Sequence, residues 1–503
     1  MELINNLILG FGVALTFNNI LYCFIGVLLG TLIGVLPGIG PIATISMLLP
    51  ATFVLPPISA LIMLAGIYYG ASYGGSTTAI LVNLPGEVSS VVTCLDGYQM
   101  ARKGQAGKAL GVAALGSFFA GTVATMLIAA FAPPLAELAL KFGPADYFSL
   151  MVLGLIAAVV LAHGSLIKAI AMIVLGLLIG LIGTDVNSGV ARYSFGLPEL
   201  IDGIGIGTIA MGTFGFSEIV RNLEHGEKRE VFVKSITGLL PNWEDIKQCA
   251  MPTIRGTVIG SALGILPGGG PVLGSFSAYT LEKKVAKDPS RFGKGAIEGV
   301  AAPESANNAA AQTSFIPLLT LGIPSNPVMA LMIGAMIIHG IQPGPQIMTA
   351  KPDLFWGMIA SMWVGNLLLV VLNLPLIGMW VKLLTLQYRF LYPAILLFCC
   401  IGVYSISNAS MDVLMAALFG FIGYTFIKLE CEPAPLLLGF VLGPMMEENL
   451  RRALLLSRGD PMVFLTRPIS LTLLIISAVL LMLVISPAMA KKREEAFAEP
   501  PAV

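Results

Sequence analysis

Charged side chains are scarce in this sequence. They make up 11% of the 503 residues, hydrophobic residues make up 56%, and the mean hydropathy is +0.89. An ordinary soluble domain carries about 25% charged residues. The composition therefore excludes a soluble protein and predicts a polytopic membrane protein. The 28 basic and 28 acidic residues cancel to a net charge of zero, which excludes the basic footprint of a nucleic-acid-binding protein.

Groups that would support catalysis or a resident metal are also lacking. The six cysteines form no Cys-x-x-Cys pair and have no histidine at metal-ligand spacing, so we interpret them as small packing residues. His163, His225 and His339 are dispersed, without a catalytic partner at a recognisable spacing. No GxxxxGK[ST] loop for ATP phosphates is present. The sequence predicts no enzyme and no cofactor.

A repeated proline- and glycine-rich motif is the most informative feature that is present. Residues 34–41, GVLPGIGP, return 230 positions later as residues 264–271, GILPGGGP, with six of eight positions identical. Each copy interrupts an apolar segment. Non-helical backbone survives at membrane depth only where it packs against protein or lines a polar cavity. Matched breaks in two halves of a chain indicate the binding site of a secondary transporter.

The hydrophobic runs predict about ten to thirteen membrane segments, since a spanning helix needs about 20 apolar residues. The first twenty residues lack the features of a cleaved signal peptide and lead into the first helix. We expect a second, polar break at residues 72–86 and an aqueous segment at 96–108. The expected spans are 7–33, a half-span at 42–55, 58–70, 109–131, 148–161, 166–182, 203–220, 253–266, 328–340, 354–374, 391–405, 413–427, 434–442 and 469–485.

Three stretches of the second half match the first half in the same order, which predicts a duplication. They are the two PGxGP loops, residues 313–325 with 76–86, and residues 410–430 with 165–185. We predict a first transmembrane repeat at 1–220, a polar connecting loop at 221–250, a second repeat at 251–467, and a C-terminal helix and tail at 468–503. Basic residues place the loop and the tail in the cytoplasm under the positive-inside rule: Arg221, Lys228, Arg229, Lys234, Lys247, Lys491, Lys492 and Arg493.

Several polar residues inside apolar stretches have two possible interpretations. Asn307 and Asn308 offer amide donors and acceptors to a ligand or a cation, and Glu304 offers a charge partner. The alternative is a helix N-terminal cap at an aqueous boundary, because Pro-Glu-Ser resembles a cap. The hydroxyls of residues 76–78 either contact a ligand or bond their own helix. The glycines near residues 66–75 either permit close helix packing or border the ligand.

Five acidic residues near predicted span ends are interpreted as interfacial groups rather than proton relays. They are Asp146, Asp185, Asp202, Glu218 and Asp412.

Six stretches together resemble the large membrane subunit of the tripartite tricarboxylate transporters: GVLPGIGP, YGGSTTAILVNLPGE, DGYQMARKGQAGKALG, GILPGGGP, FGKGAIEGVAAPESANNAAA and IPLLTLGIPS. The resemblance covers nearly the whole chain. It implies an all-α polytopic membrane protein with two homologous repeats in inverted orientation and broken or re-entrant helices. It further implies a permease of the bacterial inner membrane. Its partners would be a small four-helix membrane subunit and a periplasmic solute-binding protein. Its cargo would be citrate-like tri- or dicarboxylates, and a cation gradient, that of sodium, would drive their uptake.

The resemblance also places the substrate and the coupling cation between the two repeats, beside the broken loops. The residues that match are Pro37, Gly38, Gly40, Pro41, Ser76, Thr77, Thr78, Asn83, Pro267, Gly268, Gly270, Pro271, Asn307, Asn308, Thr313, Gly322, Pro324 and Ser325. Half-helix N-termini at the loops suit a carboxylate, and carbonyls at the opposite helix ends suit a small cation.

Other functions remain open at this point. A channel would also fit paired broken helices, whereas an intramembrane enzyme lacks a nucleophile and base. Within the transporters, the alternatives are a stand-alone carboxylate carrier and a proton-coupled carboxylate symporter that needs no binding protein.

Overall fold

The computed structural model describes residues 2–36, 40–161, 165–185, 188–225, 236, 238–266, 270–384 and 388–485. Most of them lie in helices, and the strands among them form one two-stranded hairpin. The first-half helices are α1 (Glu2–Ala14), α2 (Phe17–Val35), α3 (Gly40–Thr52), α4 (Pro57–Val82), η1 (Val88–Ser90), α5 (Val91–Thr93), η2 (Cys94–Tyr98), α6 (Gln99–Arg102), α7 (Ala106–Ala139), α8 (Pro144–Leu161), α9 (Leu166–Gly180), η3 (Pro198–Leu200), α10 (Ile206–Ala210), η4 (Met211–Phe216) and α11 (Ser217–His225). The prediction of a helical protein is confirmed.

The second half begins with a helix that starts soon after the polar stretch near residue 230. Its helices are α12 (Trp243–Gly264), α13 (Gly270–Val285), η5 (Pro289–Arg291), α14 (Glu298–Thr313), α15 (Phe315–Leu321), α16 (Pro327–Ile338), α17 (Ile347–Ala350), α18 (Pro352–Asn373), α19 (Ile377–Leu384), α20 (Tyr388–Ser407), α21 (Ser410–Lys428), α22 (Ala434–Leu456), α23 (Val463–Thr466) and α24 (Pro468–Ile485).

Within the described ranges, four helices are long and apolar enough to cross a membrane by length and composition: α2, α7, α18 and α21. Six further apolar helices are shorter: α1, α3, α8, α9, α16 and α24. Large apolar side chains also point outward, with Ile167 79%, Phe421 69% and Met482 72% exposed. Such a surface suits lipid rather than water. The fold is that of a multi-pass helical membrane protein.

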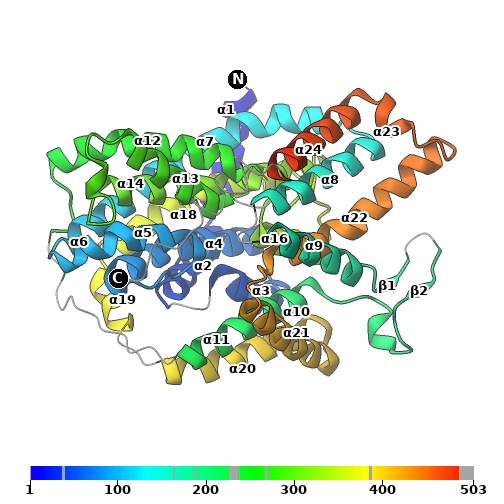
Figure 1. Ribbon diagram of the computed structural model, residues 1–503, viewed down its shortest axis with the longest axis horizontal. Coiled ribbons are helices and arrows are strands. Elements are labelled where there is room, and N and C mark those ends of the chain that lie inside the picture. Colours follow the sequence, from blue (N-terminus) through cyan, green and yellow to red (C-terminus); the bar gives the residue numbers. More distant parts are fainter. Residues whose placement is uncertain are drawn as a thin grey trace.

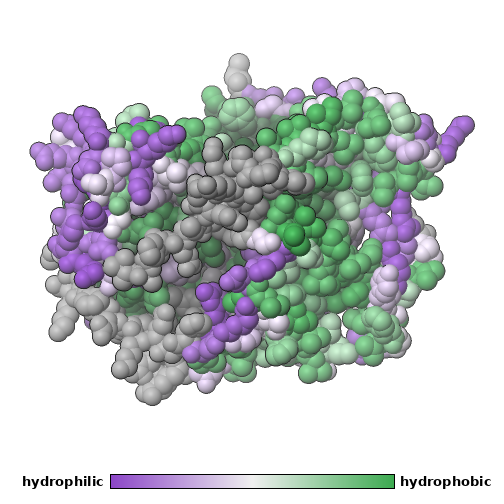
Figure 2. All heavy atoms as spheres, in the orientation of Figure 1, coloured by the Kyte–Doolittle hydropathy of each residue, from purple (hydrophilic) through white to green (hydrophobic). Residues whose placement is uncertain are grey.

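The molecule has two polar ends with an apolar region between them (Figure 2). At the first, which we name the α6 end, Lys103 donates to the Lys294 carbonyl (2.5 Å), and Gln248 donates to Glu298 (2.8 Å). At the second, the hairpin end, lie the strands β1 (Gly183–Thr184) and β2 (Ala191–Arg192), on the opposite side from α6 in Figure 1. Helix α7, about 50 Å long at 1.5 Å per residue, joins the two ends.

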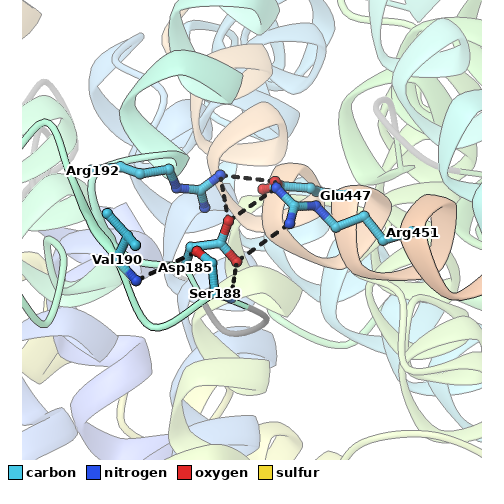
Figure 3. Close-up of polar contacts among 6 residues, drawn as sticks. All are labelled: Asp185, Ser188, Val190, Arg192, Glu447 and Arg451. Atoms are coloured by element: carbon cyan, nitrogen blue, oxygen red, sulfur yellow. Dashed lines mark hydrogen bonds and ion pairs between the residues drawn. The ribbon is translucent and has the colours of Figure 1, made fainter.

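The hairpin is fastened to α22 by a network of four charges (Figure 3). The strands pair antiparallel, with Gly183 opposite Arg192. Arg192 contacts Glu447 at 2.8 Å, and Arg451 contacts both Glu447 (2.6 Å) and Asp185 (3.0 Å). The hydrogen bond that Arg192 donates to Glu447 raises the pKa of Arg192 above its usual value. Each arginine in this network forms ion pairs with carboxylates, so the network holds the hairpin against α22.

Helix pairs in the two halves pack through the same glycine spacing. In α2, a Cβ added at Gly26, Gly30 or Gly34 would lie within 2.2–2.4 Å of a carbonyl oxygen of α4. In α12, the corresponding positions 256, 260 and 264 would meet carbonyl oxygens of α14 at 2.1–2.5 Å. Only glycine permits two backbones to approach this closely. Of the two interpretations of the glycine-rich helices, close packing is the one that the structure supports.

Three expectations about local structure are wrong. The first apolar run is not one span, because Leu15 and Thr16 separate α1 from α2. The polar residues 72–78 do not break a helix, because α4 is continuous to Val82 and their side chains face other protein groups. The segment after residue 96 is not wholly aqueous, since Asp96 is fully buried and accepts hydrogen bonds from the Gly295 and Ala296 amides, both at 2.7 Å.

Candidate functional site

A cavity of about 290 Å³ lies where segments of the two halves meet. Its walls come from the starts of α3, α13 and α16, the η1 turn, the η4–α11 segment and the start of α22. The lining residues are Pro41, Ile42, Tyr68, Glu87, Val88, Ser89, Thr213, Phe214, Ser217, Glu218, Arg221, Pro271, Val272, Leu273, Asn326, Pro327, Val328, Ile427, Glu432, Pro433 and Ala434. We name it the central cavity.

The first turns of two broken-off helices border this cavity. Helix α3 begins at Gly40 and α13 at Gly270, each with a positive φ (64° and 22°), and each is followed by a proline that lines the cavity. The first amides of a helix have no carbonyl partner within it, and the aligned peptide dipoles give that end a partial positive charge. Two such ends from opposite halves of the chain suit a small anion.

Two matched corners bring a polar side chain to the same cavity. The residue that directly follows α4, Asn83, has the left-handed conformation (φ 57°). The residue that directly follows α15, Gly322, has the same conformation (φ 71°). Four residues later stand Glu87 and Asn326, and both line the cavity. Asn326 accepts from the Met329 amide (3.0 Å) and donates to Tyr68 (3.2 Å). The halves thus contribute one carboxyl and one amide at equivalent positions.

Hydroxyl groups occupy the carbonyl ends of the helices that precede the two breaks. Thr78 donates to the Val35 carbonyl at 3.0 Å, at the end of α2. Ser314 lies 3.3 Å from the Gly264 carbonyl, at the end of α12, and also donates to the Ala310 carbonyl at 2.7 Å. The last carbonyls of a helix have no intrahelical partner, so these hydroxyls stabilise the interrupted ends.

A second polar cluster, the Glu304 network, lies inside the protein. The Glu304 carboxyl accepts hydrogen bonds from the hydroxyls of Ser76 and Thr93, and the Asn307 amide approaches it at 3.4 Å. Asn308 donates to Ser117 (2.8 Å) and to the Asn307 side-chain oxygen (2.6 Å). All these residues are buried. Among the described residues, no basic side chain forms an ion pair with Glu304.

One of the two interpretations of Glu304 is therefore wrong. It is no cap at an aqueous boundary, because α14 begins six residues earlier at Glu298 and Glu304 is 0% exposed. Pro303 lies inside the helix rather than at its first turn. A carboxyl buried this deeply needs several hydrogen bonds to offset its lost hydration, and the network supplies them.

The structure divides the sequence-predicted residues among several places. Pro41 and Pro271 line the central cavity, and Gly40 and Gly270 start its two helices. Ser76, Asn307, Asn308 and Glu304 belong to the Glu304 network, and Thr77 lines a small void of about 10 Å³ beside it. Asn83 is exposed at its corner; Gly322, Pro324 and Ser325 are buried at theirs. Thr78 and Thr313 bond backbone carbonyls. Pro37, Gly38, Pro267 and Gly268 lie outside the described residues.

Sequence reasoning missed most of the cavity wall, including the polar residues Tyr68, Glu87, Arg221 and Asn326. The signal for two of them was present, since Glu87 and Asn326 each directly follow a matched Leu/Ile-Pro-small corner. The comparison of the two halves stopped one residue short of them. Tyr68 carried no signal, because an aromatic residue in an apolar run resembles any core residue.

Two of the acidic residues that we interpreted as interfacial are buried against basic partners. Asp146 is fully buried, where it pairs with Arg467 at 2.7 Å and accepts from the Gly143 amide. Asp185 is 6% exposed, because it holds the hairpin network. Both ionised groups are paired, as buried charges must be.

Comparison with known proteins gives a family match and two relatives. The profile of the "Tripartite tricarboxylate transporter TctA family" matches residues 20–438. An Agrobacterium vitis protein described as an uncharacterized 52.8 kDa protein in the 3′ region of ttuC′ in TAR-I is 61% identical over 499 residues, which cover 99% of both chains. A second A. vitis protein, from the corresponding region of TAR-II, is 62% identical over 240 residues, which are 48% of this chain and 99% of the relative. No solved structure matches.

Proposed function

We propose, because this chain belongs to the tripartite tricarboxylate transporter TctA family, that it is the substrate-translocating membrane subunit of a binding-protein-dependent importer. Its cargo is a citrate-like tri- or dicarboxylate, and a cation gradient, in the first instance that of sodium, drives uptake by alternating access. The partners are a small four-helix membrane subunit and a periplasmic solute-binding protein, and the membrane is the bacterial inner membrane.

The central cavity is the observation that carries this proposal. Two helix N-termini and the Arg221 side chain supply donors for carboxylate groups, beside the acidic residues Glu87, Glu218 and Glu432 of the same lining. Its volume of about 290 Å³ is close to the lower limit for small-ligand pockets, about 300 Å³. The substrate carboxylates would therefore bind between the first turns of α3 and α13.

The coupling cation would bind to oxygen atoms on the same walls. Glu87 contributes a carboxyl group to the cavity, and a hard cation prefers carboxylate and carbonyl oxygens. A cation beside Glu87 would offset both that charge and the charge of the substrate, which lowers the cost of desolvating them together. The cation thereby favours the loaded state, and its gradient biases transport inward.

Inverted repeats would explain how one cavity is exposed alternately to two sides. The shared glycine spacing of α2–α4 and α12–α14, and the left-handed corners at Asn83 and Gly322, support this arrangement. Alternating access would then be a movement of these broken segments against the longer apolar helices.

The positive-inside rule places the α6 end in the cytoplasm. Basic residues gather at this end, in short loops and near helix ends: Arg102, Lys103, Lys108, Lys247, Lys283, Lys284, Lys287, Arg291, Lys294 and Lys382. The hairpin end then faces the binding protein. Helix α22 starts at the central cavity with Ala434 and reaches the hairpin network at Arg451, a rise of about 25 Å. The cavity therefore lies far from the hairpin end, as an inward-facing state requires.

The experiment is uptake of labelled citrate into proteoliposomes that contain this chain and its small subunit. Binding protein and an inward sodium gradient are added separately and together. We expect uptake only when both are present. Uptake without the binding protein would favour the stand-alone carrier, and uptake that follows a proton gradient without sodium would favour proton coupling.

A matched pair of variants tests the cavity itself. Asn326→Asp keeps the oxygen that caps α16 but adds a negative charge to the cavity wall, so we expect uptake to fall at least tenfold, which corresponds to about 1.4 kcal/mol. Asn242→Asp makes the same change at the cap of α12, where Asn242 accepts from the Asp245 amide at 2.8 Å. That control should transport normally. Equal uptake by both variants would contradict the assignment of the central cavity.

A further inference from the structure

A second polar cavity, of about 310 Å³, opens at the hairpin end. It lies among the start of α8, the loop before α17 and the charged half of α22. The lining residues are Phe142, Gly143, Pro144, Tyr147, Met151, Leu321, Gln342, Pro343, Gly344, Pro345, Gln346, Met445, Glu448, Asn449 and Arg452. We name it the outer cavity.

A single corner of the chain separates the outer cavity from the central one. Leu321, the last residue of α15, lines the outer cavity, and Asn326, the cap of α16, lines the central cavity. The residues between them, 322–325, are buried. Gly322 packs against the loop before α17 so closely that an added Cβ would lie 2.7 Å from the Pro343 carbonyl oxygen. A movement of this corner would change what separates the two cavities.

The outer cavity offers mainly hydrogen-bond donors. Arg452 provides a guanidinium group, and its ion pair with Glu448 (2.5 Å) engages only the Nη2 atom. The amides of Gln342, Gln346 and Asn449 add further donors to the lining. The one acidic residue in the lining, Glu448, is already paired with Arg452.

A second guanidinium group lies behind the wall. A Cβ added at Gly143 would lie 2.8 Å from the Arg467 Nη1 atom, so this group borders the cavity through the smallest residue of the lining. Arg467 pairs with the buried Asp146. Arg452 is the better partner for a ligand, because its side chain is 63% exposed, whereas that of Arg467 is 43% exposed.

We propose that the outer cavity is a carboxylate-binding vestibule, in which Arg452 and the neighbouring amides hold the substrate before the 322–325 corner admits it to the central cavity. This inference rests on the proposed function and deepens it. A planar guanidinium matches a carboxylate with two parallel hydrogen bonds. An anion that leaves a binding protein would meet this positive group before the apolar interior.

The test is protection of an introduced cysteine in the purified full-length chain. Gln346→Cys places a thiol in the outer cavity, and Val88→Cys places one in the central cavity, where Val88 is 62% exposed. The neutral reagent N-ethylmaleimide modifies the thiols, and mass spectrometry reads each position. Citrate and succinate are the probes, with sodium chloride of equal ionic strength as the blank. We expect either carboxylate to slow modification at position 346 at least threefold.

Two further variants, each combined with Gln346→Cys, identify the recognising group. Arg452→Gln should remove the protection. Arg458 is an exposed arginine at the same end that does not line the outer cavity, so Arg458→Gln should leave the protection intact. No protection at position 346, or protection that survives Arg452→Gln, would overturn the vestibule. If the carboxylates protect position 88 but not position 346, the vestibule is refuted and the proposed function stands. If they do not protect position 88, the result counts against the proposed function.

Discussion

Single residues in the protein interior show how polar groups are kept at membrane depth. Glu304 has no basic partner among the described residues, and its carboxyl is held instead by hydroxyl and amide donors from α4, α5 and its own helix. Without it, the Thr93 hydroxyl and the Asn307 amide would lose this acceptor, whereas the Ser76 hydroxyl would keep the Ser72 carbonyl at 3.0 Å. An unsatisfied buried polar group costs about 1–3 kcal/mol. The network therefore stabilises the contact between the two halves, whatever its part in transport.

Replacement of Glu304 separates its hydrogen bonds from its charge. Glu304→Ala takes the acceptor from the Thr93 hydroxyl and the Asn307 amide and opens a void, so we expect a clear fall in the thermal unfolding temperature of the detergent-purified chain. Glu304→Gln keeps one oxygen acceptor, and its amide can donate to a hydroxyl oxygen, so most of the stability should remain. Intrinsic fluorescence during heating measures both. A Gln variant as unstable as the Ala variant would show that the charge itself is required.

The helix pairs α2–α4 and α12–α14 approach one another closely through glycine. In lipid the hydrophobic effect does not drive helices together, so close backbone contact and dispersion must do so. The α12–α14 pair illustrates the limit, because a Cβ at Gly260 would lie 2.1 Å from the Ala306 carbonyl oxygen. The two backbones cannot separate at Gly260 alone, because added Cβ atoms at Gly256 and Gly264 would also lie within 2.5 Å of α14.

The glycine contacts predict opposite effects for one substitution at two sites. Gly260→Ala forces α12 away from α14, and overpacking of this kind costs about 1–3 kcal/mol. Gly12→Ala, in α1, meets nothing within 4 Å and should be neutral or stabilising, because alanine favours a helix over glycine by about 0.5–1 kcal/mol. Thermal unfolding of the two variants in the same detergent compares them. Equal unfolding temperatures would contradict the packing argument.

The whole molecule is polarised between its α6 end and its hairpin end. Lysine dominates the loops of the α6 end, whereas the charges of the hairpin end largely form pairs and networks such as Asp185 with Arg451 and Asp146 with Arg467. Membrane insertion responds to the number of basic residues near the spans. The proposed orientation rests on this difference, and so do the sides of the membrane that we propose for the two cavities.

Cysteine accessibility tests the orientation directly. Lys287→Cys marks the α6 end and Glu199→Cys the hairpin end, and both native side chains are exposed. In right-side-out membrane vesicles, a membrane-impermeant maleimide should modify Glu199→Cys at once and Lys287→Cys only after the vesicles are opened. The unsubstituted chain gives the background of its six cysteines. The reverse pattern would invert the assignment of both cavities.

The sequence predicts most of the elements, because membrane segments are specified locally. Hydropathy predicts α9, α18, α21 and α24 with boundaries close to those observed, and predicts α7 without its last eight residues. It fails where local composition misleads: residues 72–78 are polar, yet α4 continues through them, and the hydroxyls of Ser76 and Thr78 find partners on their own backbone or on another helix. A polar run breaks a membrane helix only if its side chains lack such partners.

The sequence predicts that the candidate site is built on broken helices, but not which polar residues meet there. Proline and glycine fix backbone conformation from within a few residues, so the broken helices and the left-handed corner at Gly322 could be expected from the sequence alone. The tertiary structure decided which polar groups meet: Ser76 lies 228 residues from Glu304, and Tyr68 lies 258 residues from Asn326. Such partners are brought together only by the packing of distant helices, and no local pattern encodes that packing.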